Sequence, residues 1–166
     1  MAFDTFLKIT GVDGESVRQG HEKEIEIYSF SWGASNPTTV GHGTGLTAGK
    51  VSVSSFNIMK KTDKASPSLF QACCVGKTYT DAVVAMQKAS GNAATPIKFL
   101  TYTFKDVMVE SIQWSGSSGG DDTPTESISI AFASVQIDYT PQGMEGDASG
   151  NASASWDIAK VTTAAK

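Results

Sequence analysis

The sequence predicts an all-β protein with one short helix, folded as a closed barrel or a sandwich. Apolar and polar residues alternate along many short segments, which is the pattern of strands that bury one face. Only residues 66–76 combine a start signal, an apolar face and a stop signal for a helix. The connections between these segments are rich in glycine, as turns between antiparallel strands are.

The strands are expected where alternation is clearest. They span residues 4–9, 22–33, 51–59, 79–88, 97–104, 107–114 and 127–139, with a short strand around Trp156. Residues 11–20, 92–95 and 115–125 are expected to be turns, residues 143–155 to be loose, and the tail from Thr162 to be frayed.

The strand at residues 22–33 has large side chains on both sides. One side carries Glu24, Glu26, Tyr28, Phe30 and Trp32, and the other carries Ile25, Ile27, Ser29 and Ser31. We therefore expect a core on one side of this strand and a partner surface on the other.

Two changes of alternation predict breaks in strands. The apolar residues change parity between Val53 and Phe56, and again between Phe132 and Val135. A slip of one residue moves side chains to the opposite face, so each change predicts a bulge or a bend.

Residues 37–49 are expected to form a long loop. The segment contains Gly41, Gly43, Gly45 and Gly49, and its only bulky aliphatic residue is Leu46. Loops of this length are uncommon unless they have a function.

The helix signals are specific. Ser66 is expected to be the N-cap, Pro67 the first helical residue, and Gly76 the stop. Helical spacing then predicts a buried face and an opposite face. The buried face holds Leu69, Phe70, Cys73 and Cys74, and the opposite face holds Ser68, Gln71, Ala72 and Val75.

Composition excludes several classes of function. The chain has 166 residues, is expected to be one domain (1–166), and is long enough to bury about 70% of its unfolded surface. Its net charge of −4 argues against nucleic acid as the main partner. The small basic cluster of Lys60, Lys61 and Lys64 is interrupted by Asp63, which favours a solvated turn.

The chain is expected to fold in a reducing compartment without a signal or a membrane span. Cys73 and Cys74 are the only cysteines, and neighbouring cysteines bridge only with strain. The N-terminus lacks the basic start and apolar run of a cleavable signal. No apolar stretch approaches the 18 residues that a membrane helix needs.

The chemical motifs are weak, so we predict no catalytic site, metal or cofactor. Ser118 occupies the centre of a G-x-S-x-G pattern, but a hairpin turn is favoured because no helix signal follows it. Gly76-Lys77-Thr78 resembles the end of a phosphate loop, yet it leaves a helix instead of entering one. Neither His21 nor His42 has metal-ligand spacing. The three tryptophans, Trp32, Trp114 and Trp156, favour core or interface positions.

Several motifs, taken in order, resemble the Hcp family, the inner tube proteins of bacterial type VI secretion systems. Besides the strand at residues 22–33 they are GES at 14–16, AGKV at 48–51, DKASP at 63–67, ACCVGK at 72–77, TE at 125–126 and DYTPQ at 138–142. The resemblance runs from residue 4 to about residue 158, and the stretch at 143–155 departs from it.

This resemblance implies a compact β-barrel of two antiparallel sheets with a flanking helix and a long protruding loop. Six copies would close into a ring, and rings would stack into a tube that encloses small effector proteins. The helices would line the bore with Ser68, Gln71, Ala72 and Val75. The loop would dock on the neighbouring ring through Gly41, His42, Gly43 and Leu46.

The resemblance also implies partners and a route. The partners would be the chain itself, a contractile sheath, a spike protein at the tip and the effectors, with no nucleic acid and no membrane span. The chain would leave the bacterial cytoplasm through the type VI apparatus. Three alternatives stay open: a phage-type tail tube protein, a monomeric β-barrel binding module, and a hydrolase that uses Ser118.

Overall fold

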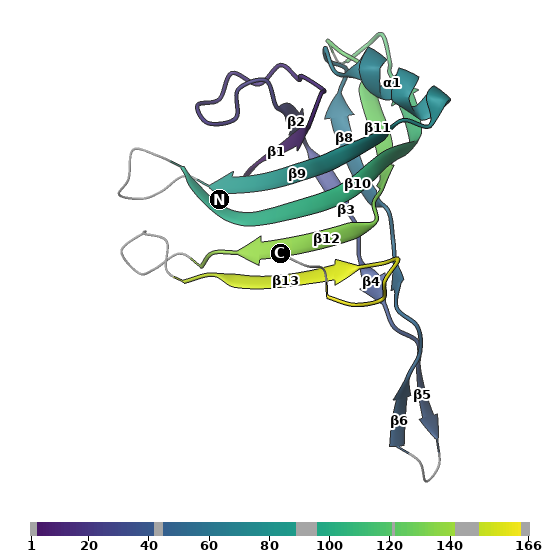
Figure 1. The fold of residues 1–166 in the computed structure, drawn as a ribbon. Helices are drawn as coiled ribbons and strands as arrows, with labels where there is room; N and C mark the ends of the chain where they lie inside the picture. The colour runs from purple at the N-terminus through teal and green to yellow at the C-terminus, as the bar shows by residue number, and fades with distance from the viewer. Residues whose placement is uncertain (1–2, 42–44, 89–95, 121, 142–149, 164–166) are drawn as a thin grey trace.

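Figure 1 shows the chain in a computed structural model, which describes residues 3–41, 45–88, 96–120, 122–141 and 150–163. Curved antiparallel strands form the body, the helix lies at one end, and a narrow hairpin projects from the other. The elements are β1 (Asp4–Ile9), β2 (Ile25–Ile27), β3 (Ser29–Ser31), β4 (Ala34–Ser35), β5 (Thr38–Gly41), β6 (Gly45–Ala48), β7 (Ser52–Val53), β8 (Phe56–Lys61), α1 (Ser66–Val75), β9 (Thr78–Lys88), β10 (Ile97–Ser115), β11 (Thr125–Ala131), β12 (Ser134–Tyr139) and β13 (Ala152–Asp157). The predicted all-β fold with one short helix is confirmed.

The main sheet runs in the order β2-β1-β9-β10-β11-β8-β3, and β12 and β13 extend it from β10. The first half of β10 pairs with β12 and the second half with β11. The sequence predicted two strands here, but β10 is one strand of 19 residues. The ladder with β9 continues on both sides of Asp106, which adopts a φ of 50°, so the strand bends without ending.

The strand expected at residues 22–33 is divided at Tyr28 into β2 and β3. Ile25 and Ile27 are buried before the break, and Phe30 and Trp32 pack against the same core after it. The alternation shifts at the break, so the large side chains expected on opposite faces pack on one core; the partner surface on this segment stays a prediction. Tyr28 is the large hydrophobic side chain that this segment leaves in solvent, with 64% of its surface exposed.

The two predicted breaks are confirmed. β7 ends at Val53 and β8 begins at Phe56, while β11 ends at Ala131 and β12 begins at Ser134. Apolar residues on both sides of each break face the same core. The break turns the following side chains inward again, although their parity along the sequence has changed.

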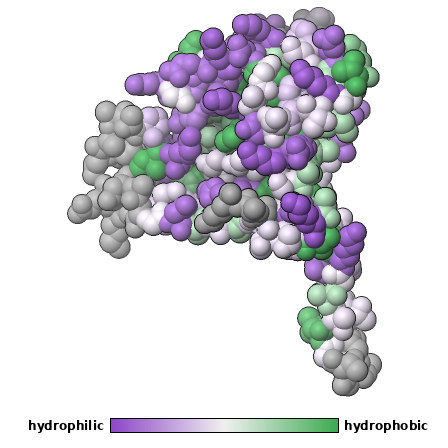
Figure 2. All heavy atoms as spheres, in the orientation of Figure 1, coloured by the Kyte–Doolittle hydropathy of each residue, from purple (hydrophilic) through white to green (hydrophobic). Residues whose placement is uncertain are grey.

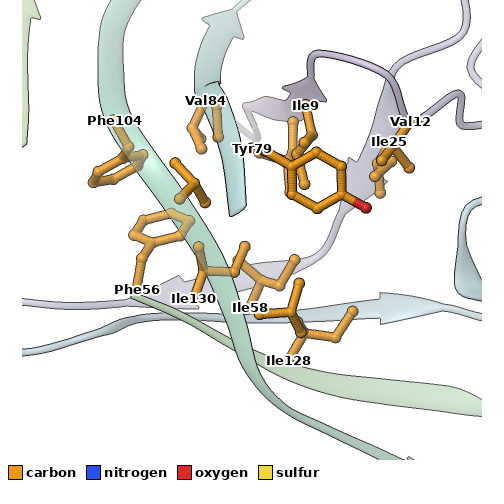
Figure 3. Close-up of a cluster of buried hydrophobic side chains, with 14 of the residues drawn as sticks. Ile9, Val12, Ile25, Phe56, Ile58, Tyr79, Val84, Phe104, Ile128 and Ile130 are labelled. Atoms are coloured by element: carbon orange, nitrogen blue, oxygen red, sulfur yellow. The ribbon is translucent and has the colours of Figure 1, made fainter. Parts of the chain in front are cut away.

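The core is a continuous cluster of aliphatic and aromatic side chains from strands across the main sheet (Figure 3). Phe56 and Phe104 face one another with ring centroids 4.9 Å apart, and Ile58, Ile128 and Ile130 pack beside them. Each fully buried side chain of this kind stabilises the fold by about 1.5–3 kcal/mol. This cluster holds the sheet on which the exposed elements are mounted.

The stretch expected to be loose at residues 143–155 is partly ordered. β13 begins at Ala152 and pairs with β12 from Tyr139 to Ser134, so the end of this stretch is a strand. Residues 142–149 and the turn expected at 92–95 lie outside the described residues.

Candidate functional site

The segment expected to be a long loop contains a two-stranded hairpin. β5 and β6 pair in the register Thr38↔Ala48, Thr39↔Thr47, Val40↔Leu46 and Gly41↔Gly45. Leu46 is 75% exposed. His42 and Gly43, which were expected to take part in stacking, lie outside the described residues. Residues 37–49 include no Lys, Arg, Asp or Glu, and the described part of the hairpin is pale to green in Figure 2.

The base of the hairpin is fixed by hydrogen bonds. The Gly33 N–H donates to Ser54 Oγ at 2.8 Å, and the Ser54 N–H donates to the Gly33 carbonyl at 2.9 Å. The Gly49 N–H donates to the Pro37 carbonyl at 2.7 Å, and a Cβ at Gly49 would lie 2.7 Å from that oxygen. The hairpin therefore leaves the body in a defined direction (Figure 1).

The helix buries Leu69 as predicted, and Cys73 packs partly buried against the core, but the rest of its buried face differs from the prediction. Its buried residues are Ser66, Leu69 and Ala72, whereas Phe70 is 49% exposed and Cys74 is exposed. The prediction centred the buried face on the larger side chains. The small side chains of Ser66 and Ala72 instead allow the helix to approach the sheet closely. Of the residues expected to line a bore, Ser68, Gln71 and Val75 are exposed, and Ala72 is buried.

The start of the helix is also different from the prediction. Ala65, not Ser66, is the N-cap, while Gly76 ends the helix in the left-handed region as expected. Ser66 Oγ accepts hydrogen bonds from the Asp63 N–H at 2.9 Å and from Lys60 Nζ at 3.0 Å. The hydroxyl of Ser66 is thus engaged with the sheet and the turn, and does not cap the helix.

A buried ion pair joins the neighbouring strands β8 and β11, and Ser66 at the start of the helix hydrogen-bonds to it. Lys60 is fully buried, which contradicts its assignment to a solvated turn, and its Nζ lies 2.8 Å from Glu126 Oε2 and 2.7 Å from Asp63 Oδ1. Trp114 Nε1 donates to the other oxygen of Glu126 at 2.6 Å. Burial by itself raises the pKa of the Glu126 carboxyl, but the surrounding hydrogen bonds and the charge of Lys60 outweigh burial and lower it.

The same pair supports an exposed aromatic contact. The rings of Trp114 and Phe70 meet edge to face with centroids 5.7 Å apart, and both are exposed by more than two fifths. Because the indole N–H of Trp114 is bound to a buried carboxylate, the exposed surface of this pair is apolar.

An apolar pocket lies next to the hairpin base. It has a volume of about 200 Å³ and lies between the segments that flank the hairpin and the strands β12 and β13. Its lining consists of Trp32, Ala34, Val51, Val53, Val135, Ile137, Ala154, Ser155 and Trp156. The Nε1 atom of Trp156 is buried, and it has no hydrogen-bond partner among the described residues.

Comparison with known proteins decides the family. The model of the family "Type VI secretion system effector, Hcp" matches residues 6–139. The chain belongs to the Hcp family of type VI secretion proteins. Protein hcp1 of Pseudomonas aeruginosa strain PAO1 is 40% identical to it over 150 residues, which cover 90% of this chain and 91% of that protein.

Solved Hcp structures share the fold. The structure of a type six secretion system protein matches with a TM-score of 0.92 and 36% identity, covering 98% of this chain and 100% of its own. Hcp1 from Salmonella typhimurium matches with a TM-score of 0.78 and 34% identity, covering 99% and 100% of the two chains. The recognised resemblance to the Hcp family is thereby confirmed.

The motifs that suggested chemistry have structural positions in this Hcp protein. Ser118 lies in the connection between β10 and β11, and a strand follows it where a hydrolase elbow needs a helix. His21 is buried, stacks on Phe6 with ring centroids 4.4 Å apart, and places Nδ1 2.6 Å from Glu24 Oε2. Within the described ranges, no group of three or more His, Cys, Asp and Glu could hold a metal ion. No helix in those ranges is long and apolar enough to cross a membrane.

Sequence reasoning missed two features of the Hcp chain. The ion pair joins Lys60 to Glu126, which lies 66 positions later in the chain. Glu126 belongs to the TE motif at 125–126, and Lys60 lies just before the DKASP motif at 63–67. The pocket combines Trp32 with Trp156, which the sequence assigned only to a core or an interface. No local signal identifies either partner, because each pairing depends on how the strands meet.

Proposed function

We propose that this chain is a structural subunit of the type VI secretion tube. Six copies close head-to-tail into a ring, and stacked rings enclose small effector proteins and are expelled with them. The observation that carries the proposal is the uncharged hairpin β5–β6, which projects from the body and exposes Leu46. A monomer gains nothing from exposing such an element, whereas an assembly can bury it.

Docking of a single hairpin is weak, and a ring compensates by docking six hairpins together. An aliphatic side chain contributes at most about 1.5–3 kcal/mol when fully buried. One such contact binds weakly, but six contacts on one rigid ring act together and raise the effective affinity. The role needs no chemistry from the chain, since the tube acts by enclosure and by movement.

Two exposed surfaces suit a bore wall. The exposed helix face with Ser68, Gln71 and Val75 is uncharged, as the family resemblance implied for the wall. The outer face of β3, β8 and β11 is rich in small polar groups. In register across the strands it presents Ser31, Asn57 and Ser129, with Ser29, Met59 and Ser127 in the next row. We assign the wall to the helix face, and the sheet face is the competing surface.

The wall assignment is tested by labelling cysteines in assembled tubes. Single cysteines at Gln71 and at Ser129 are introduced into chains whose two native cysteines are replaced by serine. A bore residue reacts with a small maleimide but is shielded from a large polymer-linked maleimide. Shielding at Gln71 alone supports the helix wall, and shielding at Ser129 alone overturns it.

The partners follow from the tube role. A contractile sheath surrounds the tube, a spike protein sits at its tip, and effectors lie in the bore. The chain assembles in the bacterial cytoplasm and leaves through the type VI apparatus.

The assembly itself is tested by mass. Sedimentation at micromolar concentration is expected to give a species near six times 17.4 kDa, and electron microscopy is expected to show rings and tubes. A strict monomer would refute the proposal and favour a monomeric β-barrel binding module. Rings that do not stack under any condition would support the six-membered ring but refute the tube.

A further inference from the structure

The pocket at the hairpin base is a built apolar site that the described residues of one chain do not fill. It is lined by two tryptophans and by aliphatic side chains from four segments of the chain. A cavity of about 150 Å³ with such a lining can hold a benzene-sized group, so the volume of about 200 Å³ accommodates one leucine side chain. None of the described residues that line it is Lys, Arg, Asp or Glu, so this lining does not select a charged group.

The second observation is a missing hydrogen bond. Trp156 contributes its ring to the pocket, and its buried Nε1 has no partner among the described residues. A buried donor without an acceptor costs about 1–3 kcal/mol, and a carbonyl of the incoming hairpin removes that cost once the pocket wall moves aside on binding and the oxygen reaches Nε1. The site therefore fits an aliphatic side chain carried on a backbone with free carbonyl groups.

The same chain carries an element with these two properties. Leu46 is 75% exposed on β6, and β5 and β6 pair only with each other in the described sheets. Each strand of a two-stranded hairpin has one edge with unpaired carbonyl groups. The hairpin is uncharged, so its entry into an apolar pocket desolvates no ion.

The hairpin cannot fill the pocket of its own chain. Val51 lines the pocket and Leu46 lies five residues before it, roughly 16 Å away along an extended chain. The hydrogen bonds at the base direct the hairpin away from the body (Figure 1). We propose that the pocket between Trp32 and Trp156 receives Leu46 from a second copy of this chain, with Trp156 Nε1 donating to a carbonyl of the incoming hairpin. The inference rests on the self-assembly proposed above, and it names the surface that receives the hairpin.

Crosslinking between copies tests the contact directly. In chains with both native cysteines replaced by serine, Leu46→Cys in one chain is mixed with Ala154→Cys in a second chain of different mass, under conditions that give tubes. A short bismaleimide is expected to join the two masses. Ser153→Cys is the matched control, because Ser153 neighbours Ala154 on β13, is likewise exposed, and points to the opposite face of the strand.

The outcomes separate this inference from the proposed function. Tubes with crosslinking at Ala154 no greater than at Ser153 overturn the inference while the tube role stands. Crosslinking of Leu46→Cys to Cys74, in a second chain that keeps this native cysteine, would place Leu46 at the end of the helix and would also overturn the inference. Absence of any assembly would refute the tube role and the inference together.

A second variant tests the hydrogen bond separately from packing. Trp156→Phe keeps an aromatic ring in the pocket and removes the N–H. Ring-to-ring association is expected to weaken by about 3- to 10-fold per contact, which corresponds to one hydrogen bond. The melting temperature of the unassembled chain is expected to stay level or rise, because an unsatisfied buried donor has been removed. A lower melting temperature with unchanged association would mean that Trp156 is only structural, and would overturn the inference.

Discussion

Replacement of Lys60 by methionine is expected to destabilise this protein more than most single substitutions. Lys60 and Glu126 are both fully buried, and Lys60 Nζ lies within 3.0 Å of Glu126, Asp63, Ser66 Oγ and the Lys61 carbonyl. Lys60→Met leaves the Glu126 carboxylate without its counter-charge. Removing one partner of a buried pair costs about 3–5 kcal/mol. For a chain of this length, that loss lowers the melting temperature by about 6–20 °C.

The stability lost in Lys60→Met depends on pH, and the lowered pKa of Glu126 sets the direction of this dependence. The pKa of Glu126 lies below its ordinary value of 4.5, so the pair contributes stability above about pH 4.5 and loses it as the pH falls through the folded-state pKa. In Lys60→Met, burial without a counter-charge raises the pKa of Glu126. The variant therefore carries its penalty above pH 4.5 and regains stability, relative to the parent, below that pH.

Urea unfolding at pH 7 and at pH 4 measures both effects, at one protomer concentration because assembly shifts apparent stability. The double variant Lys60→Met with Glu126→Gln is the control. It removes both charges and keeps an oxygen for the Trp114 N–H, so at least half of the lost stability should return. A cost below about 1 kcal/mol at pH 7, or a double variant no more stable than the single one, would refute the reasoning.

Three further predictions concern the helix and the hairpin. Leu69→Ala should lower the free energy of unfolding by about 2–5 kcal/mol, Phe70→Ala by less, and Gln71→Ala by no more than about 0.5 kcal/mol, as measured by urea unfolding; equal costs would contradict the buried face described above. Leu46→Asp should leave six-membered rings in sedimentation but abolish tubes in electron microscopy, and tubes of normal length would show that the hairpin does not stack the rings. Gly49→Ala should shorten or abolish tubes, because the added Cβ would collide with Pro37 at the hairpin base. The collision lies outside the core, so the melting temperature should stay within a few degrees of the parent's. Tubes like those of the parent would contradict this prediction.

Local patterns in the sequence located many, but not all, of the elements of the fold. Alternation located β1 at the residues expected, and Gly76 ended the helix where predicted. The changes of parity after Val53 and Phe132 marked real breaks between strands. Such signals succeed because alternation, helix stops and turn residues act over a few neighbouring positions, and each position reports its own backbone geometry.

The surfaces and the polar centre were decided only by the tertiary structure. Lys60 looked like a turn residue until the fold brought Glu126 within 2.8 Å of it. The helix buries Leu69 together with the small residues Ser66 and Ala72, and Phe70 lies outward against Trp114. The break at Tyr28 directs the large side chains before it and after it to a single core. Trp32 and Trp156 form a pocket because distant strands meet there, and no pattern within either segment contains that information. Burial and pairing depend on contacts between segments far apart in the chain, so they follow from the packing of the whole sheet.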